Sequence, residues 1–459
     1  MFNFEENFDK RKIRFNSVFN NSNKEFVFKY QNSITKSTLQ KHLCIFPQEE
    51  QEFLTYEEAL EDFNQFKYYI HNFYSGYFVF NTMNFEKAFY DINKILQNKE
   101  KIKTTDFIKL ILEKLNFIID KHFCFQYCGQ HYKLNLPKYK TYYNADYQIL
   151  KIFNKFYITI NRAKYLIKSI NGNENIESFL KKGINNNGII VSALVIQSTQ
   201  KEYFLNMELG NRKTLKIPLK TLEISTKHNE LLDIEKKENF TLIHNQRCYE
   251  NSKDEKKYFL KNLAELKNAK NKIFVINAID GQGGDDEFVF EILKALGFNN
   301  IDLIENEVST TINGINFNEE KNIVINKFMK LYESTLNSNS PNILKYKQAK
   351  IRFNEPNPDN VVIVLNSRNT LSASESYINL LPYKNVIFLG DYTGGCFQFC
   401  PCKKFYLNKS GACIKLGSSY FYLNDLKLEN VGYEPDLFLL CANEEKEQAI
   451  SNFVHNYLI

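Results

Sequence analysis

The sequence is organised around the stretch from Val361 to Leu381, in which a buried strand is expected to turn directly into a helix. Residues 361–365 are apolar and mostly β-branched, which is typical of a strand buried on both faces. Apolar side chains then recur at helical spacing from Ala373 onward. Ser372 is therefore predicted at a helix N-terminus, where free backbone N–H groups and the helix dipole can stabilise a developing oxyanion. A simple N-cap serine is the alternative interpretation.

Composition narrows the class of protein. The 459 residues allow about two to four domains. The net charge of +6 is spread thinly without a basic stripe, which argues against nucleic acid as a partner. We find neither a targeting segment nor an apolar run of spanning length, so no membrane partner is expected. Nine scattered cysteines suit reduced thiols, and we expect a cytoplasmic protein.

The order of predicted elements divides the chain into five regions. Short strands dominate one region, and strands that alternate with helices dominate the next, which predicts an α/β fold with a mainly parallel sheet. The expected regions are an N-terminal extension (1–50), a bundle domain of three amphipathic helices (51–130), a small β-rich module (131–225), an α/β catalytic domain (226–440) and a C-terminal helix (441–459).

Four polar segments follow predicted strands in the α/β region. Glycine lets the backbone approach a ligand and offer its N–H groups, and two of these segments are rich in glycine. One histidine, His122, lies where the last helix of the predicted bundle gives way to a strand. The four segments are DGQGGDD (280–286), SASE (372–375), GDYTGG (390–395) and ENVGYEPDL (429–437).

In this order the segments resemble the motifs of the tail-specific, or C-terminal-processing, serine peptidases, whose catalytic domain has a ClpP/crotonase-like fold. The family has a Gly-rich loop after a strand, a Ser-Ala-x-Glu nucleophile turn, Gly-x-x-Thr-x-Gly and a late Gly-x-x-Pro-Asp. The match covers about residues 270–440, and the helical region that ends at His122 extends it to about residue 55. The resemblance implies hydrolysis of peptide bonds in peptides or unfolded protein termini, without a cofactor or a metal. It leaves the oligomeric state open.

The family uses two kinds of catalytic base. One branch has a Ser–Lys dyad, with the lysine shortly after the Gly-x-x-Thr segment, where this chain has Cys396. Lys403 and Lys404 come several residues too late. The tricorn-like branch uses Ser, His and Glu, and the resemblance to it points to Ser372, His122 and Glu429.

In that arrangement His122 would take the proton of Ser372, and Glu429 would fix the tautomer of the imidazole. The backbone N–H of Ala373, together with that of Gly283 or Gly284, would form the oxyanion hole.

Departures from the family motifs keep other functions open. Lys121 replaces the small residue that usually precedes the histidine, and Asn277 and Ile279 alter the Gly-rich loop. A catalytically inactive peptide-binding or scaffold protein on the same fold is the principal alternative. A crotonase-fold enzyme that acts on thioesters is a lesser one, because no adenine-nucleotide signature accompanies the loop. The β-rich module resembles a PDZ-like peptide-binding insert only loosely.

Two further groups of residues have alternative interpretations. Cys396, Cys400, Cys402 and Cys413 follow a C-x3-C-x-C pattern and not the paired C-x2-C of a zinc ribbon, so we predict no metal site there. His131, nine residues after His122, is the reserve candidate for the catalytic base.

Overall fold

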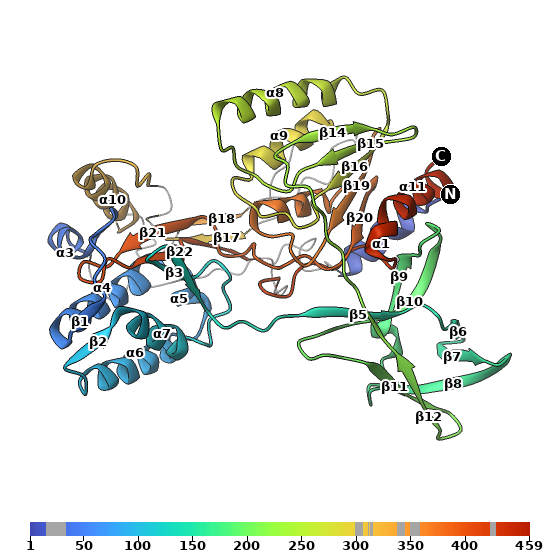
Figure 1. Ribbon diagram of the computed structural model, residues 1–459, viewed down its shortest axis with the longest axis horizontal. Coiled ribbons are helices and arrows are strands. Elements are labelled where there is room, and N and C mark those ends of the chain that lie inside the picture. The colour runs from blue at the N-terminus through green and yellow to red at the C-terminus, as the bar shows by residue number, and fades with distance from the viewer. Residues whose placement is uncertain are drawn as a thin grey trace.

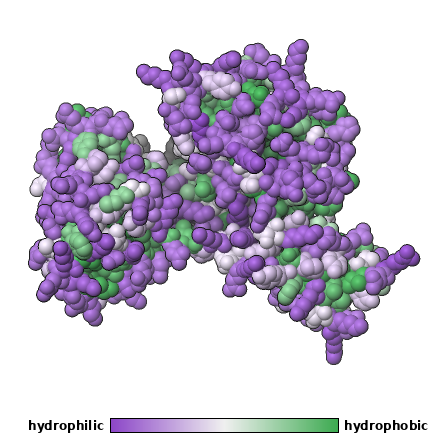
Figure 2. Space-filling model, in the orientation of Figure 1, coloured by the Kyte–Doolittle hydropathy of each residue, from purple (hydrophilic) through white to green (hydrophobic). Residues whose placement is uncertain are grey.

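The computed structural model describes residues 1–14, 34–298, 306–310, 312, 315–336, 345–348, 359–422 and 428–459. A largely helical lobe lies at one end, an α/β lobe lies beside it, and a small antiparallel sheet projects below the α/β lobe (Figure 1). The surface is mainly hydrophilic in the same view, and a narrow waist separates the helical lobe from the rest (Figure 2). In the described part of the chain, no helix is both long enough and apolar enough to cross a bilayer.

The α/β lobe is built on a mixed sheet of ten strands within the described residues. Its central strands pair in parallel, from β9 through β24, β20, β19 and β16 to β15, whereas the pairs at both edges are antiparallel. The α/β class and the parallel centre are as predicted. In sheet order the strands are β13 (Lys220–Thr221), β5 (Lys140–Asn144), β10 (Ile190–Ser198), β9 (Leu180–Ile184), β24 (Leu437–Leu439), β20 (Val386–Gly390), β19 (Val361–Asn366), β16 (Ile273–Asn277), β15 (Thr241–His244) and β14 (Asp233–Lys236).

Helices cover both faces of this sheet. On one face, α8 (Lys253–Lys267), α9 (Glu287–Ala295) and the 3₁₀ helix η3 (Ser372–Leu380) share a core with β16 and β19. On the other face, α11 (Lys446–Tyr457) packs with the N-terminal residues around α1 (Phe4–Arg14). Burial on both sides explains the continuous apolar runs of the central strands.

The helical lobe takes its core from distant parts of the chain. Its largest helix, α4, begins with the predicted capping box between Thr55 and Glu58. Strand β3 (Cys124–Tyr127) pairs with β22 (Cys413–Gly417), so a segment that lies between β20 and β24 in the chain completes this lobe. The other elements are α3 (Lys36–His42), β1 (Phe53–Thr55), α4 (Tyr56–Phe73), α5 (Gly76–Val79), α6 (Thr82–Leu96), β2 (Lys101–Lys103), α7 (Thr104–Lys114), β4 (Gln130–Lys133), α10 (Lys321–Leu336) and β21 (Cys402–Tyr406).

The strands of the predicted β-rich module divide among three sheets. Strand β4 pairs with β3 in the helical lobe, and β5, β9, β10 and β13 join the large sheet. The others form the projecting five-stranded sheet (Figure 1). The domain boundaries, including a PDZ-like module, stay predictions. In order, the projecting sheet contains β12 (Thr214–Pro218), β11 (Phe204–Leu209), β8 (Ala163–Ile170), β7 (Lys155–Ile160) and β6 (Ile149–Ile152), and a further sheet contains β18 (Lys345–Gln348), β17 (Asn306–Ser309) and β23 (Ser419–Tyr422).

Two local predictions differ from the structure. The helix expected to end at His122 ends at Lys114, and the chain reaches His122 through turns. The segment after Ser372 is a 3₁₀ helix, and not the α-helix that its spacing predicted. Every residue from Ala373 to Leu380 is buried, so the apolar spacing there carries little information about helix type.

Candidate active site

Ser372 lies at the turn between β19 and η3. Its φ is +54°, in the left-handed region that non-glycine residues rarely adopt. A Cβ atom on Gly283 would lie 2.6 Å from the Cβ of Ser372, so the Gly-rich loop approaches this turn as closely as glycine permits. Such backbone strain persists only where the surrounding structure enforces it, and is commonly found at functional sites.

His122 faces Ser372 across the boundary between the two lobes. Its Nε2 lies 3.1 Å from the Ser372 Oγ, although the two residues are 250 positions apart in the chain. The backbone N–H groups of His122 and Phe123 both donate to Asp120 Oδ1, at 2.7 and 3.2 Å, which fixes the turn that carries the imidazole. Burial lowers the pKa of His122 to about 3, so the ring is neutral at physiological pH.

Glu429 does not take the predicted place beside the imidazole. Its carboxylate accepts backbone N–H groups of Lys121 at 2.9 Å, Phe397 at 3.2 Å and Gln398 at 3.0 Å. In the described structure no hydrogen bond joins Glu429 to His122. Burial raises the pKa of Glu429 well above its ordinary value. These hydrogen bonds could not be predicted from the sequence, because the pattern of side chains does not show which backbone N–H groups a carboxylate will bind.

Thiols occupy the space around the imidazole of His122. Cys396 Sγ lies 3.6 Å from Nδ1 and 3.5 Å from Nε2, and Cys400 Sγ lies 3.8 Å from Nδ1 and 3.7 Å from Nε2. Burial raises the pKa of the Cys396 thiol well above its ordinary value. The imidazole is therefore faced by neutral, weakly polar groups instead of a carboxylate.

The three candidates for the oxyanion hole lie in the Gly-rich loop and the nucleophile turn. The N–H of Gly283 donates to Ser374 Oγ at 3.2 Å and is engaged within the protein. The backbone N of Ala373 lies 3.1 Å from where a Cβ on Gly283 would be. Gly284 has a φ of +137° and bridges to Cys248 beside the same loop. Because the Gly283 N–H is already engaged, Ala373 and Gly284 are the remaining candidate donors.

Glu375 is a buried carboxylate at this site for which no role was predicted from the sequence. It accepts the N–H of Ser372 at 3.2 Å, of Gly395 at 2.9 Å and of Cys396 at 2.6 Å, so it ties the nucleophile turn to the Gly-Gly loop. Burial raises the pKa of Glu375. Its position three residues after Ser372, as in a capping box, was the available signal.

A cavity of about 650 Å³ lies beside the reacting pair. Apolar residues such as Leu371 and Pro137 line it together with cationic ones, and Lys121 Nζ reaches into the site to donate to the carbonyl of Gly394. Arg368 donates through Nη1 to the carbonyls of Thr393 and Val431, whereas in the described structure its Nε and Nη2 are buried without a partner. A buried guanidinium with unused donors is suited to an anionic group of a ligand.

The remaining candidate residues lie elsewhere. His131, the reserve base, is exposed on β4 and contacts Gln126. Lys403 Nζ donates to the carbonyl of Ile315 at 2.9 Å, and Lys404 follows it on β21. Cys413 lies buried on β22.

Comparison with known proteins gives similarity in structure alone. No family model matches the chain, and no curated protein matches it either. Mature CPAF complexed with lactacystin is similar at a TM-score of 0.45 and 10% identity, over 87% of this chain and 97% of that one. The photosystem II D1 C-terminal processing protease is similar at a TM-score of 0.36 and 11% identity, over 83% of this chain and 92% of that one. Tricorn protease is similar at a TM-score of 0.38 and 10% identity, over 86% of this chain and 35% of that one.

These neighbours are tail-specific peptidases. Their identities to this chain are near one tenth and their TM-scores are below 0.5.

Proposed function

We propose that the protein is a serine peptidase that hydrolyses peptide bonds in peptides or unfolded protein termini, with Ser372 as nucleophile and His122 as base. The observation that carries this proposal is the 3.1 Å separation between His122 Nε2 and Ser372 Oγ. A serine hydroxyl is a poor nucleophile until a base lies within hydrogen-bonding distance. The neutral imidazole of His122 offers the lone pair that such a base needs.

In the proposed reaction, His122 accepts the proton of Ser372 as Oγ attacks the scissile carbonyl. The backbone N–H groups of Ala373 and Gly284 hold the oxyanion of the tetrahedral intermediate, and each such donor contributes about 3–4 kcal/mol to the transition state. His122 then passes its proton to the leaving amine. Water, activated by the same imidazole, hydrolyses the acyl-enzyme and restores Ser372.

Glu429 acts as a positioning residue in this proposal. Because its carboxylate binds the backbone at Lys121 and at residues 397–398, it holds the segment that carries His122 against the segment that carries Cys396. This differs from the tricorn-like expectation, in which the glutamate contacts the imidazole itself. The effect on catalysis would come through the orientation of the ring.

The substrate class follows from the cavity beside Ser372. Its apolar walls suit the side chains of an extended peptide, and the unused donors of Arg368 suit a carboxylate. We infer that the enzyme prefers substrates with an acidic side chain or a terminal carboxylate close to the scissile bond.

A fluorophosphonate probe separates this proposal from the inactive scaffold. The wild-type protein should be labelled, and Ser372→Ala should not, because the probe needs an activated serine. Ser178→Ala changes an exposed serine that is distant from Ser372 in the sequence. It is the matched control, and the probe should label it normally. Absence of labelling in folded wild-type protein over a range of pH would favour the scaffold.

A further inference from the structure

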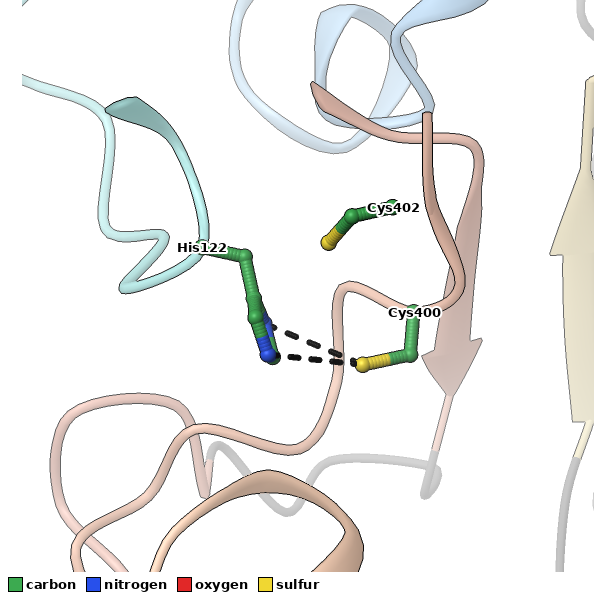
Figure 3. A group of neighbouring side chains, drawn as sticks. All are labelled: His122, Cys400 and Cys402. Atoms are coloured by element: carbon green, nitrogen blue, oxygen red, sulfur yellow. Dashed lines mark hydrogen bonds between the residues drawn. The ribbon is translucent and has the colours of Figure 1, made fainter. Parts of the chain in front are cut away.

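Three potential metal ligands converge beside the proposed base. The ligand atoms of His122, Cys400 and Cys402 all lie within 4.8 Å of one another. The Cys400 thiol points at the imidazole, and the Cys402 thiol projects toward the same space from the start of β21 (Figure 3). His122 comes from the helical lobe, whereas the two cysteines are separated from it by 278 and more positions.

The spacing between Cys400 and His122 is close to that of two ligands in a tetrahedral zinc site. With Zn–S near 2.3 Å and Zn–N near 2.0 Å, ligand sulfur and nitrogen atoms lie about 3.6 Å apart. Cys400 Sγ lies 3.7–3.8 Å from the two ring nitrogens of His122. Cys396 Sγ, at 3.5–3.6 Å, can supply a fourth ligand without a large rearrangement. Two or three thiolates with one imidazole are the donor set that zinc prefers.

We propose that His122, Cys400 and Cys402 bind a zinc ion, and that the bound ion inactivates the enzyme by occupying its base. The binding of the ion is independent of the proposed peptidase activity, whereas the inactivation rests on it.

Coordination through either ring nitrogen would remove the base. If zinc binds Nε2, the lone pair that faces Ser372 is used directly. If zinc binds Nδ1, the neutral ring carries its proton on Nε2 and can only donate to the hydroxyl. Both modes leave Ser372 without a proton acceptor.

The site lies close to the surface. Cys400 and Cys402 are partly exposed as whole residues, whereas Cys396 is buried. The thiol hydrogen bond to Cys402, together with burial, raises the pKa of Cys400 well above its ordinary value, so binding must displace protons from the thiols. The two thiols lie only two positions apart, and the third ligand lies 278 positions before the first of them in the chain, which is why the cysteine spacing by itself predicted no metal.

Cobalt provides a direct test of the site. Reduced wild-type protein, kept free of thiol reductants, should bind one equivalent of Co²⁺ with a thiolate-to-cobalt charge-transfer band in the near ultraviolet, and Zn²⁺ should abolish the band. Cys400→Ser and Cys402→Ser should each weaken binding more than the roughly 10–100-fold that loss of a second-shell partner costs. A wild-type protein without the band, or a band that persists in both variants, would overturn the proposal.

A second cluster in the chain supplies the matched control. His228, Glu235 and His244 also lie within 4.8 Å of one another but contain no thiol. Cobalt bound there gives no thiolate charge-transfer band, so His228→Ala should leave that band unchanged. Loss of the band in His228→Ala would show that the signal does not come from the cluster at His122.

Alkylation keeps the proposal testable if a cysteine variant fails to fold. Zinc should protect Cys400 and Cys402 of the wild-type protein from iodoacetamide, while the exposed Cys128 is modified with or without zinc. Equal modification of Cys400 and Cys402 in both conditions would contradict the zinc site.

Fluorophosphonate labelling then separates the two proposals. Zinc should block labelling of Ser372 in the wild-type protein, and a chelator should restore it. A cobalt band in a protein that never labels would retain the metal site and reject the peptidase. Normal labelling of the zinc-loaded protein would reject the inactivation.

Discussion

The two halves of the candidate site are held in different ways. On the α/β side, Ser372 lies at the turn between buried strand β19 and η3, and the carboxylate of Glu375 binds three backbone N–H groups around it. On the helical side, His122 is carried by a turn that two other carboxylates, Asp120 and Glu429, hold through the backbone. In both halves, buried carboxylates hold loops in place through backbone N–H groups. In the helical half, the imidazole of His122 also lies beside the thiols of Cys396 and Cys400.

The difference indicates how each half can be regulated. The backbone N–H groups around Ser372 bind Glu375 within one lobe, so the turn is preorganised whether or not ligand is present. The imidazole of His122 depends on the contact between lobes and has soft ligands beside it. We therefore expect the geometry around the proposed nucleophile, Ser372, to change little. We expect the proposed activity to be regulated through the proposed base, His122.

The largest effect should come from removal of the base. His122→Ala should lower kcat at least about 10⁴-fold with the structure retained, because Ser372 would have no proton acceptor. Lys403→Ala and Lys404→Ala are matched controls on β21 and should change turnover little. Steady-state kinetics on an unstructured peptide provide the measurement. Near-normal turnover of His122→Ala, together with loss in a lysine variant, would restore the Ser–Lys dyad.

Glu429→Gln sharpens the same comparison. If Glu429 acts only through the backbone it binds, the substitution should lower kcat much less than His122→Ala and leave KM nearly unchanged. Equal losses in the two variants would instead show that the carboxylate acts directly on the imidazole.

The α/β half has its own electrostatic anchor. Arg11 of α1 and Asp436 beside β24 form an ion pair at 2.6 Å, with side chains 0% and 1% exposed. Burial alone would raise the pKa of Asp436, but Arg11 and Arg14 outweigh it and hold the pKa below its ordinary value. Asp436→Asn leaves Arg11 buried without its partner, which should lower the free energy of unfolding by about 3–5 kcal/mol.

The pair also sets a pH dependence. Because the folded-state pKa of Asp436 is depressed, its contribution to stability is complete above the unfolded-state pKa near 4 and is lost as pH falls below that value. Denaturant unfolding from pH 7 to pH 3 should show this loss in the wild-type protein and less of it in Asp436→Asn. Glu6→Gln, which removes a partner of an exposed ion pair, should change stability little. Parallel pH profiles for the wild-type protein and Asp436→Asn would contradict the assignment.

The sequence predicted the parts of this molecule that depend on local pattern. A continuous run of mostly β-branched residues predicts a buried strand such as β19, and the spacing of Thr55 and Glu58 predicts the capping box of α4. The motif resemblance also selected Ser372 and His122, which the structure places within hydrogen-bonding distance.

Other features depend on contacts that no local pattern encodes. The carboxylate of Glu429 accepts hydrogen bonds from backbone N–H groups of two separate segments. Its position relative to the imidazole therefore could not be predicted from the spacing of residues in the sequence. Arg11, in a region expected to be a polar extension, is fully buried against residues 370 and 372 positions away. The thiols around His122 come together only because β3 pairs with β22.

The smallest effect concerns the cavity where the two halves meet. Arg368 lies beside Ser372 on the β19–η3 turn, and its guanidinium lies 4.8 Å from the ring centre of Tyr392. Arg368→Lys keeps the positive charge but loses the planar fork that binds a carboxylate through two N–H groups. We expect KM for peptides with an acidic residue near the scissile bond to rise about tenfold, equivalent to about 1.4 kcal/mol, with kcat nearly unchanged.

Neutral peptides of the same length provide the comparison for this prediction, because their KM should change little in Arg368→Lys. Arg162→Lys, on an exposed turn between β7 and β8, is the matched control and should behave as wild type with both peptides. An equal rise in KM for acidic and neutral peptides would mean that Arg368 stabilises the loop through the carbonyls of Thr393 and Val431 and does not bind the acidic group of the substrate. A change confined to acidic peptides would place recognition on the α/β half, beside the nucleophile, and leave the helical half with the base and its control.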